Sequence, residues 1–101
     1  MATARRQLFD QGGVDSTARV LKCLGHPLRL RILDVLEREG EATVTEIHEA
    51  LEIAQAVASQ HLTTMRDKGI LEFRKDGAHV LYRIGDDRAL KVLACVRESV
   101  C

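Results

Sequence analysis

The sequence predicts a mainly α-helical domain with one β-hairpin. Apolar residues recur with helical spacing over most of residues 14–68 and again near the C-terminus. Between residues 43 and 68 a short link separates two helical segments, and from Ile70 to Ile84 the apolar pattern changes to every second residue. The expected order is therefore four helices, a hairpin and a fifth helix.

Composition indicates one folded domain. The chain has 101 residues, of which 46% are hydrophobic and 30% charged. About a third of the surface of so short a chain stays exposed after folding, so pairing with a second copy would bury more apolar area. No apolar run approaches the ~18 residues of a membrane span, and the N-terminus lacks the apolar centre of a secretion signal. A cytoplasmic protein without membrane contact is expected, and three cysteines without framework spacing suit a reducing compartment.

The distribution of charge permits a nucleic-acid partner although the formal net charge is zero. Residues 1–31 contain six basic and two acidic side chains, whereas residues 32–52 contain seven acidic side chains and only Arg38. Residues 53–83 contain five basic and three acidic side chains. A positive surface therefore requires a fold that turns the acidic stretch away.

Residues 1–13 are expected to form a flexible arm and residues 14–101 the domain. Within the domain, residues at their ends define the first two helices. A first helix capped by Asp15 or Ser16 ends at Gly25-His26-Pro27. Pro27 suits the first turn of a second helix that Gly40 terminates, with a broad stripe of Leu28, Ile32, Leu33, Val35 and Leu36.

The third and fourth helices form the predicted helix-turn-helix. Thr43 and Glu46 have the spacing of a capping box, and the third helix turns Ile47, Ala50 and Leu51 inward. After residues 52–54 a fourth helix runs to about Lys68, with an inward stripe of Ala58, Leu62 and Met65.

The hairpin is predicted around Asp76-Gly77, which places Phe73 opposite Val80 and Arg74 opposite His79. A fifth helix capped by Asp86 or Asp87 follows, with apolar residues at Leu90, Leu93, Ala94, Val96 and Val100. These are more apolar positions than one small domain needs. Helix-turn-helix and hairpin together constitute a winged helix-turn-helix.

The outer face of the fourth helix has side chains suited to reading DNA. Gln55, Ser59 and Thr63 repeat every four residues beside Ala56 and Gln60, opposite the apolar stripe. Short hydroxyls and amides let a helix enter the major groove, and Gln presents a donor and an acceptor to adenine. The hairpin adds cations for phosphate contact, namely Arg74, Lys75, His79 and Arg83. A plain solvent-facing helix and hairpin are the alternative.

Three sequence motifs resemble the ArsR/SmtB family of winged-helix repressors over residues 14–101. They are the segment from Leu21 to Leu33 (LKCLGHPLRLRIL), Ser59-Gln60-His61-Leu62 with residues 65–71 (MRDKGIL), and the hairpin from Arg74 to Ile84. The resemblance implies a homodimer joined through the first and fifth helices, the fourth helix in the major groove of an inverted-repeat operator in double-stranded DNA, and release by an inducer. It assigns DNA contacts to Gln55, Ala56, Ser59 and Gln60, and the seating of the helix to His61. Ala54 and Ala56 stand where the family often has serine.

The inducer is left open by the sequence. The cysteine pair typical of the family is absent at the start of the third helix, and no histidine follows Asp86 and Asp87, so no metal or cofactor is assigned. Cys23, Cys95 and Cys101 allow a thiol response to oxidant or reactive sulfur, or three thiolates for arsenite. Cys101 resembles one cysteine of the family's persulfide sensors, whereas the position of the other falls at Asp34. Core packing of Cys23 and a silent Cys101 are the alternatives.

Other classes of protein fit less well. A thiol oxidoreductase would need a Cys-x-x-Cys pair, a serine enzyme an acid beside Ser59 and His61, and a nucleotide enzyme a glycine-rich loop. The chain is expected not to be an enzyme. A winged-helix module that binds only proteins remains the rival from another class.

Overall fold

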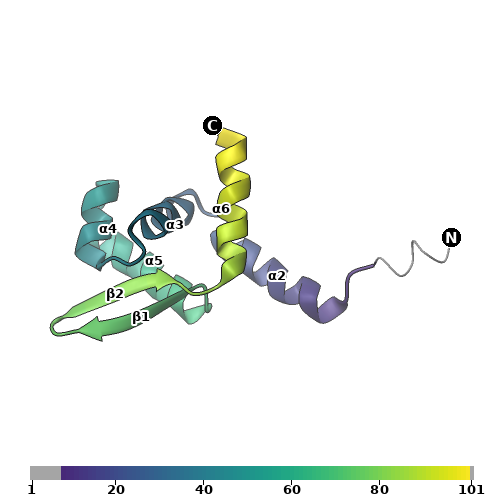
Figure 1. The fold of residues 1–101 in the computed structure, drawn as a ribbon, viewed down its shortest axis with the longest axis horizontal. Coiled ribbons are helices and arrows are strands. Elements are labelled where there is room, and N and C mark those ends of the chain that lie inside the picture. The colour runs from purple at the N-terminus through teal and green to yellow at the C-terminus, as the bar shows by residue number, and fades with distance from the viewer. Residues whose placement is uncertain (1–7, 101) are drawn as a thin grey trace.

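The computed structural model describes residues 8–100 and confirms the predicted winged helix-turn-helix. Within this range it contains five helices and a two-stranded hairpin, in the order α2 (Gln11–Leu24), α3 (Pro27–Glu39), α4 (Val44–Leu51), α5 (Gln55–Asp67), β1 (Leu71–Asp76), β2 (His79–Ile84) and α6 (Asp87–Val100). Figure 1 shows the hairpin and α2 projecting from opposite sides of the core, with α6 standing between them.

Helix α2 begins earlier than predicted. It starts at Gln11 rather than after Asp15 or Ser16, because the Asp10 carboxylate accepts a hydrogen bond of 2.8 Å from the backbone N–H of Gly13 and so caps the helix. The predicted arm was therefore too long at its C-terminal end. Its first seven residues lie outside the described range.

The ends of α3 and α4 follow the predicted caps. Pro27 occupies the first position of α3, and Gly40 ends it with a positive φ of 81°. The Thr43 hydroxyl accepts from the Glu46 N–H at 3.1 Å while the Glu46 carboxylate accepts from the Thr43 N–H at 2.9 Å, so the predicted capping box is present. The end of α3 and the start of α4 therefore lie at the residues that the sequence predicted.

The core lies between the helices and the base of the hairpin. Its largest side chains with less than 2% exposure are Leu24, Ile32, Leu33, Leu36, Ile47, Leu62, Met65 and Ile70. The prediction that Ala50 faces inward was wrong, because α4 buries Ile47 and leaves Ala50 exposed. A helix of eight residues has only a narrow stripe against its neighbours.

The register of the hairpin also differs from the prediction. Phe73 pairs with Tyr82, Arg74 with Leu81 and Asp76 with His79, so the turn consists of Gly77 and Ala78. Gly77 has a φ of +62° whereas Ala78 has no positive φ, which is the pattern of a two-residue turn with glycine in its first central position. The Asp76-Gly77 dipeptide predicted a turn in this part of the chain, but the two residues that form the turn lie one position further along.

Ala42 fixes the hairpin to the helix-turn-helix. Ala42 and Tyr82 exchange two backbone hydrogen bonds, of 3.0 and 2.8 Å, which form an isolated bridge beside β2. Ala42 immediately precedes the cap of α4, so the hairpin and α4 are held by one short stretch of chain. No helix within residues 8–100 is long and apolar enough to cross a membrane.

Candidate nucleic-acid interface

Helix α5 exposes the polar face that the sequence predicted. Gln55, Ala56, Ser59 and Gln60 are exposed and Thr63 is half-buried, and these five residues are called the reading face below. On the opposite side Ala58, Leu62 and Met65 have no exposed surface. The helix is therefore anchored along one side while the other can approach a flat or grooved partner.

The N-terminus of α5 has no side-chain cap. Ala54 is the capping residue and makes no side-chain hydrogen bond, as its methyl group requires. The Val57 N–H donates to the Ala54 carbonyl at 3.1 Å, and the backbone N–H groups of Gln55 and Ala56 have no acceptor among residues 8–100. A phosphate oxygen is such an acceptor at a helix N-terminus.

The turn between α4 and α5 is held by His48. His48 is half-buried, and its Nδ1 lies 3.1 Å from the Ile53 carbonyl oxygen. The Ile53 N–H donates to the His48 carbonyl at 3.0 Å, and Glu52 takes the left-handed conformation with a φ of 56°. Reciprocal bonds between His48 and Ile53 therefore define the angle at which α5 leaves α4.

The predicted cations of the hairpin fall into two groups. Arg74 forms a two-pronged ion pair with Glu41 at 2.6 and 3.0 Å, and Arg83 pairs with Glu72 at 2.9 Å. The hydrogen bond from Arg74 holds the pKa of Glu41 below its usual value. Lys75 and His79 are exposed, and neither has an ion-pair partner among residues 8–100. Lys75 and His79 are thus the hairpin groups that can meet phosphate without first breaking an ion pair.

Arg66 and Phe73 form a contact that the sequence interpretation missed. The Arg66 guanidinium lies over the Phe73 ring at 5.2 Å from its centroid, and Phe73 remains 45% exposed. Such a cation–π contact joins the last turn of α5 to β1. The sequence could not predict this contact, because it depends on how α5 and the hairpin pack against each other in the folded chain.

Arg29 and His61 join α5 to the α2–α3 corner. Arg29 Nε donates to His61 Nδ1 at 3.1 Å, and Arg29 Nη1 donates to the Cys23 carbonyl at 3.0 Å. The His26 ring meets the His61 ring edge-on, with 4.7 Å between centroids. Burial lowers the pKa of His61, and the nearby His26 and Arg29 lower it further. Neutral His61 accepts the Arg29 hydrogen bond, whereas a protonated ring could not.

The low pKa of His61 predicts a loss of stability in mild acid. The unfolded chain takes up this proton near pH 6.5, the ordinary value, whereas the folded chain does so only at lower pH. The free energy of unfolding should therefore be highest above pH 6.5 and fall as the pH drops from there toward the folded pKa. Urea unfolding at pH 7.5, 6.5 and 5.5 measures this dependence. His61→Gln should weaken it while His79→Gln, at an exposed histidine, leaves it unchanged; equal profiles for all three proteins would contradict the prediction.

The structure describes two of the three thiols. Cys23 is 6% exposed and Cys95 is exposed, both are free, and Cys101 lies outside the described range. Asp34 binds Arg97 of α6 at 2.8 Å, so α3 and α6 are linked there by an ion pair. Residues 8–100 contain no group of three or more His, Cys, Asp or Glu side chains placed to hold a metal ion.

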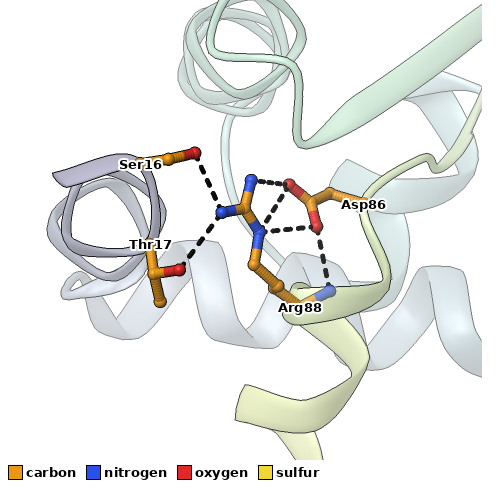
Figure 2. A network of polar contacts seen from close by, with 4 residues as sticks. All are labelled: Ser16, Thr17, Asp86 and Arg88. Atoms are coloured by element: carbon orange, nitrogen blue, oxygen red, sulfur yellow. Dashed lines mark hydrogen bonds and ion pairs between the residues drawn. The ribbon is translucent and has the colours of Figure 1, made fainter. Parts of the chain in front are cut away.

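Arg88 fastens α6 to α2. Figure 2 shows its guanidinium between the Asp86 carboxylate, at 2.8 Å, and the Ser16 and Thr17 hydroxyls, at 3.0 and 3.3 Å. Asp86 also accepts from the Arg88 N–H at 2.9 Å, as a helix cap does, and the Arg88 hydrogen bond lowers the Asp86 pKa. The two helices thus form one surface with a defined relative orientation.

That surface is apolar. Most of the exposed large hydrophobic residues lie on α2, just before it, or on α6, namely Leu8, Phe9, Val14, Leu21, Leu90 and Val100. A groove with a volume of about 460 Å³ runs along α2 between Phe9 and Leu21. Phe9, Val14 and Leu21 line this groove together, and exposed apolar residues grouped in this way mark an interaction surface.

Comparisons with known proteins agree with this architecture. A family model described as a helix-turn-helix domain matches residues 24–73. The biofilm growth-associated repressor of Agrobacterium fabrum is 33% identical over 84 residues, which cover 83% of this chain and 71% of that protein. An arsenic resistance transcriptional regulator of Pseudomonas putida is 43% identical over 65 residues, or 64% of this chain and 51% of that protein. The solution structure of a homodimeric winged helix-turn-helix DNA-binding domain from Mycobacterium bovis has a TM-score of 0.74 and 32% identity, and covers 91% of this chain and 86% of that one.

Proposed function

Because the chain belongs to the ArsR/SmtB family of winged helix-turn-helix repressors, we propose that it represses transcription as a homodimer that binds an imperfect inverted repeat. The observation that carries this proposal is the reading face: short polar side chains are exposed along α5, and its opposite side is fully buried. Such a helix enters the major groove closely and offers amide groups to base edges.

A fluorescence-anisotropy titration tests the proposal. The full chain is titrated onto duplexes from the region upstream of its own coding sequence and onto a random duplex, at several salt concentrations. Specific regulators bind their sites about 10³–10⁷-fold more tightly than random DNA, and the logarithm of the affinity falls linearly with that of the salt concentration. Weak binding without preference for any upstream sequence would instead support the protein-binding module.

The hairpin supplies contacts that do not depend on base sequence. Lys75→Ala should weaken binding equally on specific and random duplexes and reduce the salt slope by about one for each protomer, because one phosphate contact is lost. Glu41→Gln should act in the opposite direction, since it releases Arg74 from its ion pair. Glu49→Gln, at an exposed residue of α4, is the control for charge alone. An effect of Lys75→Ala on one sequence only would contradict the assignment.

The apolar surface of α2 and α6 supports dimerisation. A second copy that covers this surface would bury the groove along α2 together with Leu90 and Val100 of α6. The related domain from Mycobacterium bovis is homodimeric. Since Arg29 links α2 to α5, a dimer formed through α2 would also set the spacing of the two copies of α5 on DNA.

The signal that releases DNA is proposed to act on thiols. Cys95 is exposed to oxidant or reactive sulfur, and Cys23, although buried, has the Arg29 guanidinium 3.5 Å from its sulfur. Arsenite is the alternative, because a relative from Pseudomonas putida is named for arsenic resistance and three thiolates suit a soft ion. Mass spectrometry after treatment with polysulfide, peroxide or arsenite, paired with DNA release, separates these signals. A Cys23→Ser, Cys95→Ser, Cys101→Ser variant that still responds would refute thiol sensing.

A further inference from the structure

A pocket lined by cations lies at the junction of α2, α3 and α5. Arg19, Lys22, Arg29 and Lys68 line it with Cys23, and its volume is about 340 Å³. No carboxylate is among the lining residues. Arg19, Lys22 and Lys68 are exposed, and none of them has an ion-pair partner within residues 8–100. The pocket therefore has a local excess of positive charge, although the whole chain has equal numbers of acidic and basic side chains.

The pocket has a fixed position relative to the reading face. Lys68 is the residue that ends α5, and Arg29 lies in the first turn of α3. Arg29 donates both to His61 of α5 and to the Cys23 carbonyl of α2, so one side chain holds three helices around the pocket. The positive end of the α3 dipole and the negative ends of the α2 and α5 dipoles meet at this pocket, so its positive charge comes from the four cations.

The length of α5 exceeds the width of the major groove of DNA. The helix has 13 residues and is therefore about 20 Å long, whereas the major groove is about 12 Å wide. A recognition helix contacts base edges with its N-terminal residues, here Gln55 and Gln60, so the last turn of α5 then lies farthest from the bases and toward the phosphates at the edge of the groove. The cations at that end then face the sugar–phosphate backbone.

We propose that this pocket binds a backbone phosphate of the operator, as a contact additional to those of α5 and the hairpin. The inference depends on the proposed function, because it requires α5 to be the reading helix. It makes the α2–α3 corner part of the DNA-binding surface, and it accounts for three cations that have no ion-pair partner among residues 8–100 and that line one pocket without an acidic residue.

A pair of charge-matched variants tests the proposal. Lys22→Gln with Lys68→Gln neutralises the pocket, and Arg31→Gln with Lys91→Gln removes the same charge from exposed positions elsewhere on α3 and α6. Affinity for the operator and for a random duplex is measured at several salt concentrations, with dimer formation and thermal stability as checks. The pocket variant should lose at least about ten-fold in affinity at ~0.1 M salt and reduce the salt slope by about 0.9 for each protomer, because one phosphate contact is lost, while the control changes little.

Each of the other possible results shows whether the proposed function or the inference on the pocket is wrong. If the wild-type chain shows no salt-dependent DNA binding, the proposed function fails. If it binds DNA but the pocket variant matches the control, only the inference on the pocket is overturned. A lower melting temperature with an unchanged salt slope would mean that Lys22 and Lys68 only offset the negative helix ends of α2 and α5, and would overturn it too. Inorganic phosphate binding that the pocket variant loses, with DNA affinity unchanged, would assign the pocket to a free anion instead.

Discussion

Leu21→Asp is expected to convert the proposed dimer into a folded monomer. Leu21 is 51% exposed at the end of the groove along α2, so the charge costs little in the isolated chain. In a symmetric dimer the same substitution occurs twice. An apolar contact of an interface core contributes about 2 kcal/mol, so two copies should weaken the dimer about a thousand-fold. Sedimentation equilibrium over a range of concentrations measures this change.

The loss of the dimer should also weaken operator binding, because a monomer reaches only one half-site. Phe73→Asp is the matched control for self-association, since Phe73 is similarly exposed, at 45%, but lies on the hairpin away from α2 and α6. Leu90→Asp, on α6, should act like Leu21→Asp. If both leucine variants remain dimeric at the concentrations at which the wild-type chain is dimeric, the interface lies elsewhere.

Gln60→Ala should reduce the affinity for the operator about ten-fold or more with little effect on random DNA. Gln60 is exposed on the reading face, one turn from Ala56 and Thr64, and its amide can both donate to and accept from an adenine edge. A two-bond contact of this kind distinguishes the right base from the wrong one by about 1–3 kcal/mol. Because the side chain is exposed, circular dichroism should show an unchanged fold and melting temperature.

A double-mutant cycle with the DNA makes this test specific. Each base pair of a half-site is replaced in turn, and the affinities of the wild-type chain and the Gln60→Ala variant are compared. At the contacted base pair the wild-type chain should lose affinity and the variant should not. A uniform loss at all positions would show that Gln60 contributes to general affinity, and would assign it to the phosphate contacts.

The order and type of the elements follow from the sequence, because their signals are local. The Thr43–Glu46 capping box, Pro27 in the first turn of α3 and Gly40 at its end are each read from a few neighbouring residues, and all are present in the structure. The buried stripe of α5 also follows, since helical periodicity alone places Leu62 and Met65 on one face. Where several local signals competed, as at Asp10 and Asp15, the prediction missed the start of the helix by a few residues.

The tertiary structure determined which charged and polar side chains are in contact. Arg74 is 33 residues from Glu41, Arg29 is 32 residues from His61, and Arg88 is 72 residues from Ser16, yet each pair is within hydrogen-bond distance. Side-chain partners at such separations depend on how the helices pack, and no pattern within the sequence encodes them. Of the hairpin cations proposed from the sequence, packing therefore pairs Arg74 with Glu41 and leaves Lys75 exposed. The same packing gathers cations from α2, α3 and α5 into one pocket, because it brings the ends of three helices together.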